Sequence, residues 1–60
     1  MTDIIITEKG DRAKVSGVTP KGIEWILTYL FSDEPEFDIQ DVSKLKVHML
    51  SAGLNVEVVA

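Results

Sequence analysis

The 60-residue sequence has no cysteine, which excludes disulfide bonds and thiolate metal sites. It has one histidine, His48, and a lone histidine without other nitrogen or sulfur donors does not make a zinc site. Its longest apolar run is three residues, against roughly 20 for a membrane-spanning helix. The first residues lack the basic region and apolar stretch of a signal peptide. We therefore expect a cytoplasmic protein with no membrane partner.

Basic residues are missing from the middle of the chain, although the net charge is only −4. Residues 22–41 contain no lysine or arginine and carry these acids: Glu24, Asp33, Glu34, Glu36, Asp38 and Asp41. Proteins that bind duplex nucleic acid cluster lysine and arginine against the phosphates. Nucleic-acid binding is thus a secondary hypothesis, and it would use these residues: Lys9, Arg12, Lys14, Lys21, Lys44 and Lys46.

No motif of a catalytic, nucleotide-binding or metal-binding site is present. The four glycines are too dispersed for a phosphate-binding loop. The acidic run over 33–41 lacks the central glycine and terminal glutamate of a calcium loop, and it contains Pro35. A chain of this length also has little room to enclose a substrate. We expect no enzyme activity, no cofactor and no metal.

The length predicts one small domain over residues 1–60. A chain of 60 residues buries only about 60% of its unfolded surface, so its stability is marginal. Binding of a partner or of a second copy would add to that stability. The sequence therefore favours association, and we expect a homodimer.

The strongest helical pattern covers residues 20–32. Thr19 is suited to be the N-cap, and Pro20 occupies the first helical position, where its missing N–H is not needed. At about 100° per residue, one stripe of this helix is apolar. The stripe, which we expect to face the core, contains Ile23, Ile26, Leu27 and Leu30, with Phe31 at its edge.

Trp25 and Tyr29 lie four residues apart on nearly the opposite side of this helix, next to Gly22 and Ser32. Tryptophan and tyrosine are enriched at protein interfaces because they bury a large area and keep a polar tip. The sequence therefore predicts a protein-binding surface at these four positions. The alternative is that neighbouring segments fold over the two aromatic residues and make them part of the core.

β-Branched residues predict strands at both ends of the chain. Residues 3–7 and 12–18 have strand composition, and Gly10 between them suits a tight turn, so we expect an antiparallel hairpin. We expect a further strand over residues 54–59.

Residues 36–40 alternate polar and apolar side chains, which favours a short strand over an irregular loop. As a strand they would point Glu36, Asp38 and Gln40 outward as an acidic stripe. Such a stripe would meet a basic partner, or would imitate phosphates and inhibit a nucleic-acid-binding protein. The alternative is a charged edge strand that resists aggregation.

Residues 43–52 fit both secondary structures. As a helix they have Ser43 as N-cap and Gly53 as a left-handed stop; as a strand they alternate lysine and histidine with apolar residues. We favour the helix.

The sequence thus predicts an α+β domain of order β-β-α-β-α-β, with one antiparallel-dominated sheet and two helices, 20–32 and 43–52, on one face. The order β-β-α-α-β is the alternative. The expected function is that of a small acidic protein-interaction module, an accessory or regulatory protein that acts by binding.

Overall fold

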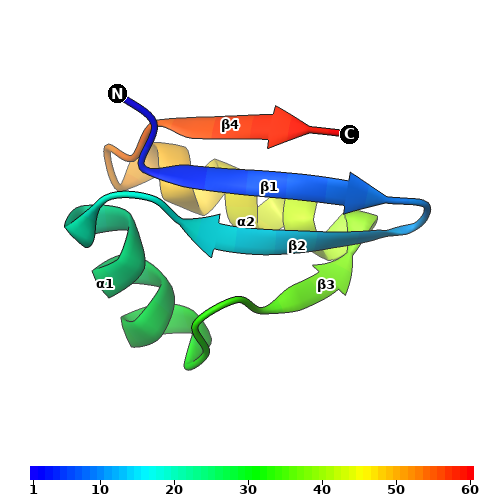
Figure 1. Cartoon of the computed structure of the whole chain (residues 1–60), viewed down its shortest axis with the longest axis horizontal. Helices are drawn as coiled ribbons and strands as arrows, with labels where there is room; N and C mark the ends of the chain where they lie inside the picture. The colour runs from blue at the N-terminus through cyan, green and yellow to red at the C-terminus, as the bar shows by residue number, and fades with distance from the viewer.

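The structure is a computed structural model that describes residues 1–60. Its elements, in chain order, are β1 (Ile4–Lys9), β2 (Arg12–Gly17), α1 (Pro20–Leu30), β3 (Glu36–Asp38), α2 (Ile39–Ser51) and β4 (Val56–Val59). The strands form one sheet in the order β3-β2-β1-β4 (Figure 1). β2 pairs antiparallel with both β1 and β3, and β4 pairs parallel with β1. The predicted α+β class and element order are confirmed.

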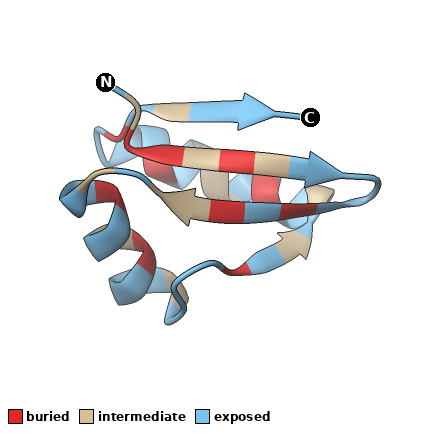
Figure 2. Ribbon diagram, in the orientation of Figure 1, coloured by how far each residue is buried: buried red, intermediate tan, exposed pale blue.

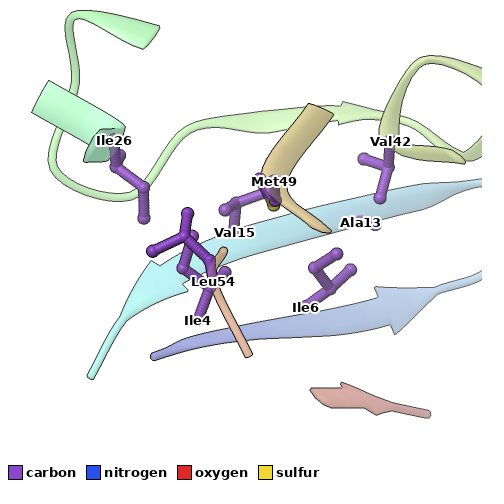
Figure 3. Close-up of a cluster of buried hydrophobic side chains, with 8 residues drawn as sticks. All are labelled: Ile4, Ile6, Ala13, Val15, Ile26, Val42, Met49 and Leu54. Carbon is purple, nitrogen blue, oxygen red and sulfur yellow. The ribbon is translucent and has the colours of Figure 1, made fainter. Parts of the chain in front are cut away.

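One face of the sheet carries the core, and both helices send their buried side chains to it. Ile6 lies opposite Val15 in the β1–β2 ladder, and both are completely buried (Figure 2). α2 crosses behind the sheet in Figure 1, whereas α1 lies beside the end of β2. The full core cluster, drawn in Figure 3, is Ile4, Ile6, Ala13, Val15, Ile26, Val42, Met49 and Leu54. The other face of the sheet has no helix.

α1 begins as predicted and ends two residues early. The Thr19 hydroxyl oxygen accepts a hydrogen bond from the Gly22 N–H at 3.3 Å, and Pro20 is the first helical residue. The helix ends at Leu30 because Phe31 adopts a left-handed conformation, with φ 58°. A left-handed residue cannot continue a right-handed helix.

The predicted core stripe of α1 is wrong in part. Ile26 is 1% exposed, but Ile23 is 44% exposed and Leu27 is 45% exposed. Leu30 is half-buried, and Phe31 is 87% exposed. α1 instead turns Gly22 and Ile26 toward the sheet.

Gly22 decides this orientation of α1. A Cβ at position 22 would overlap the carbonyl oxygen of Asp3, so only glycine lets the first turn of the helix approach the chain at the start of β1. Gly22 is buried at this contact. The prediction that it belongs to an exposed binding surface is therefore wrong.

The boundary between β3 and α2 also differs from the prediction. The strand predicted over 36–40 ends at Asp38, and the helix predicted over 43–52 starts at Ile39. Ile39 N–H donates to the Asp11 carbonyl at 3.0 Å, which fixes the first turn against the β1–β2 hairpin. Ser43 lies inside α2 and donates to the Ile39 carbonyl instead of capping the helix. Gly53, with φ 82°, follows the helix end in the predicted left-handed conformation.

Neither α1 nor α2 combines the length and the hydrophobicity needed to cross a lipid bilayer.

Asp3 joins three segments at the end of the sheet where the chain starts. Its carboxylate accepts hydrogen bonds from the Thr19 hydroxyl at 2.6 Å and from the Asn55 N–H at 2.9 Å. These two bonds hold the pKa of the Asp3 carboxyl below its usual value. Asp3 therefore links the N-cap of α1 and the start of β4 to β1.

We expect Asp3→Asn to lower the melting temperature at neutral pH, because an amide cannot accept both hydrogen bonds as the carboxylate does. The lowered pKa means that the folded state favours the charged form. The stabilisation that the two hydrogen bonds give is therefore present above the unfolded-state pKa of Asp3, and it disappears as the pH falls through the folded-state pKa of this group. In thermal melts from about pH 7 down to pH 2, the difference in melting temperature between the two proteins should disappear at the acid end.

Asp33→Asn, which removes the same charge from an exposed loop, is the control. A difference that stays constant with pH would contradict this role of Asp3.

Candidate functional site

Trp25 and Tyr29 form a tilted aromatic pair on one flank of α1. Their ring centroids are 5.0 Å apart and the ring planes are inclined by 38°. Trp25 is half-buried and packs against the core cluster, whereas Tyr29 is 63% exposed. The buried face of α1 is formed by Gly22 and Ile26 and differs from the predicted one. The aromatic pair therefore lies beside the buried face and not opposite it. Trp25 thus supports the exposed ring of Tyr29.

A groove of about 430 Å³ runs between α1 and α2. It exists because the two helices pack on the sheet rather than on each other. Its lining from α1 is Trp25, Tyr29 and Leu30. Its lining from α2 is Leu45, His48 and Ser51, followed by the C-cap residue Ala52. Leu30 and Leu45 are half-buried and also pack against the core. The groove therefore has apolar walls that the rest of the protein holds in place.

The polar groups of the groove are few: the Tyr29 hydroxyl, the His48 imidazole and the Ser51 hydroxyl. All three residues are exposed. Apolar walls with a small number of hydrogen-bonding groups are the usual composition of a site that takes apolar groups and orients them. This arrangement suits binding of apolar side chains.

The structure thus brings together two of the four residues of the predicted surface. Ser32 is exposed in the turn after α1 and is not part of the groove lining. Sequence analysis missed the contribution of α2. Leu45 and His48 of α2 and its C-cap Ala52 are spaced three and four residues apart, as residues on one side of a helix are. This spacing was the signal that the sequence offered.

Comparison of the chain with protein-family models, curated proteins and solved structures finds no match. The function is therefore inferred from the geometry of the groove and of the remaining surface.

The predicted acidic stripe is not continuous. Glu36 and Asp38 project from β3 on the sheet face without helices, but Gln40 belongs to the first turn of α2. The Arg12 guanidinium lies 2.9 Å from the Asp38 carboxylate and 3.6 Å from that of Glu36. Basic residues of β2 therefore offset the charge of the stripe, which weakens its resemblance to a row of phosphates.

The predicted basic residues do not form one patch either. Arg12 pairs with β3, and Lys14 pairs with Glu34 at 3.1 Å. The Lys21 ammonium donates to the Gly53 carbonyl at 3.0 Å. Lys44 and Lys46 lie on α2, behind the sheet. No observation specifically favours the nucleic-acid alternative.

Proposed function

We propose that this protein acts by binding another protein, and that the groove between α1 and α2 receives apolar side chains of that partner. The observation that carries the proposal is the tilted Trp25–Tyr29 pair on the wall of an apolar groove, with Tyr29 63% exposed. Aromatic residues held in place by their neighbours are frequent binding hot spots, because little conformational entropy is lost when they are covered.

The size of the groove indicates what the partner presents. Its volume of about 430 Å³ accommodates one or two large side chains rather than a folded domain. Helix-lined grooves commonly receive amphipathic segments that insert a few anchor residues. We therefore expect a partner segment with one or two large apolar anchors, whose polar atoms meet Tyr29, His48 or Ser51 at the rim.

Peptide display on the folded protein tests this proposal. Selected peptides should contain large apolar residues, and their binding should change the fluorescence of Trp25, which is the single tryptophan. Tyr29→Ala should weaken binding at least tenfold, since loss of an aromatic hot spot costs about 2 kcal/mol or more. Ser51→Arg should weaken binding similarly by filling the groove with a long side chain.

Ser32→Arg is the matched control, because it makes the same change at an exposed position outside the groove. It should leave the affinity unchanged. Peptides that bind Ser51→Arg as tightly as the parent protein would show that the groove is not the binding site. Circular dichroism of each variant verifies that the fold is retained.

A further inference from the structure

The two edges of the sheet differ in how they are protected from pairing with another strand. β3 is three residues long, follows Pro35 and carries two charged side chains, Glu36 and Asp38. Charge, proline and short length are the usual protections of an edge strand. β4, at the other edge in Figure 1, contains Val56, Val58 and Val59 with one charged residue, Glu57. β4 is thus the edge that remains open to pairing.

Backbone groups of β4 point away from the sheet at alternate residues. The Ile4 N–H donates to the Asn55 carbonyl at 3.1 Å, in a register that places Ile4 beside Val56. Backbone directions alternate along a strand, so residues 55, 57 and 59 direct their N–H and C=O groups toward β1. Val56 and Val58 therefore direct theirs to the free edge.

An apolar surface accompanies this edge on the helix side of the sheet. Val58 lies opposite the buried Ile6, so its side chain is on the helix side, and it is 40% exposed. On α2, at positions that do not line the groove, Val47 is 62% exposed and Leu50 is 52% exposed. We call Val47, Leu50 and Val58 the β4 shoulder. A strand added to β4 would run past Val58.

We propose that two copies of this chain form a symmetric dimer through antiparallel pairing of β4 with β4, which doubles the four-stranded sheet. A second copy is the occupant because β4 satisfies the conditions for pairing with itself. Its free hydrogen-bonding groups alternate, and its two side chains on the helix side, Val56 and Val58, are apolar. A two-fold axis through the joined strands would turn both β4 shoulders toward each other.

Charge selects the register of this pairing. Opposite residues in an antiparallel pair share a face, so a symmetric pairing is centred on a residue. The two registers that pair most of β4 (Val56–Val59) are centred on residue 57 and on residue 58. Centring on Glu57 would place two carboxylates directly opposite each other. Centring on Val58 places Glu57 opposite the second copy's Val59. In this register the Val58 residues of the two copies exchange both of their backbone hydrogen bonds. The dimer is therefore centred on Val58.

This dimer uses β4 and residues that do not line the groove, so it does not depend on the function proposed above. Analytical ultracentrifugation over micromolar to millimolar concentrations tests it on the full chain. The parent protein should change reversibly from monomer to dimer. Val58→Pro should remain monomeric, because proline removes an N–H that points outward, where it has no partner within the monomer. Far-ultraviolet circular dichroism verifies that this variant is folded.

Two charge variants test the register even if Val58→Pro fails to fold. Val59→Lys should tighten the dimer about two- to thirtyfold by forming two symmetric pairs with Glu57, and Val59→Glu should weaken it by a similar factor. Both changes are made at a partly exposed position and should leave the monomer folded. A parent protein that stays monomeric throughout would overturn the proposal. So would equal dimer affinities of the two charge variants, or loss of the dimer in Tyr29→Ala, which would place the interface at the groove.

Discussion

Ile26→Ala should destabilise the protein by about 2–5 kcal/mol, whereas Leu27→Ala should cost less than about 1 kcal/mol. Ile26 is 1% exposed at the contact of α1 with the sheet, so its truncation leaves a cavity that the surrounding strands cannot fill. Leu27, the next residue, is 45% exposed, and much of its side chain is in water before and after the change. The total stability of 60 residues is about 3–9 kcal/mol, so Ile26→Ala should be partly unfolded at room temperature.

Urea denaturation of both variants measures this difference. The two substitutions remove aliphatic side chains of equal size from adjacent positions on one helix, so helix propensity changes little between them. The difference between Ile26→Ala and Leu27→Ala therefore measures the effect of burial on stability. Equal losses of stability, or a larger loss in Leu27→Ala, would show that α1 faces the sheet as the sequence pattern predicted and not as the structure has it.

Gly22→Ala should destabilise the protein by about 1–3 kcal/mol, although alanine is the better helix former by about 1 kcal/mol. The added Cβ would overlap the Asp3 carbonyl oxygen, a backbone atom that cannot move without disturbing β1. That same carbonyl accepts a hydrogen bond from the Val18 N–H at 2.8 Å. Displacing α1 would therefore strain the chain on both sides of the contact.

Thr28→Ala is the control for Gly22→Ala. Position 28 is exposed on the same helix, so its change alters helix propensity without adding a contact. Thermal melts should show Thr28→Ala at or slightly above the parent temperature and Gly22→Ala several degrees below it. If Gly22→Ala melts above the parent protein, the close approach of α1 to Asp3 is incorrect.

Local signals predicted the elements because their causes lie within a few residues. The Thr19–Pro20 start of α1, the glycine of the β1–β2 turn and the left-handed Gly53 after α2 are each local, and the structure has all three. Strand composition likewise located β1, β2 and β4 within one to two residues. The prediction failed where a distant segment decides the boundary, as at Ile39, whose N–H bonds to Asp11.

Four properties follow from local sequence signals: the α+β class, the order of the elements, the charge distribution and the placement of two aromatic residues on one helix. Which side of α1 is buried depends instead on the tertiary structure. Helical periodicity locates a buried face from the positions of large apolar residues. The contact at Gly22 instead depends on the absence of a side chain, so the hydrophobic pattern does not mark Gly22 as a core position. The tertiary structure also decided the groove, because its two walls come from helices separated by β3. The free edge of β4 was decided in the same way, since strand order is set by packing across the whole chain.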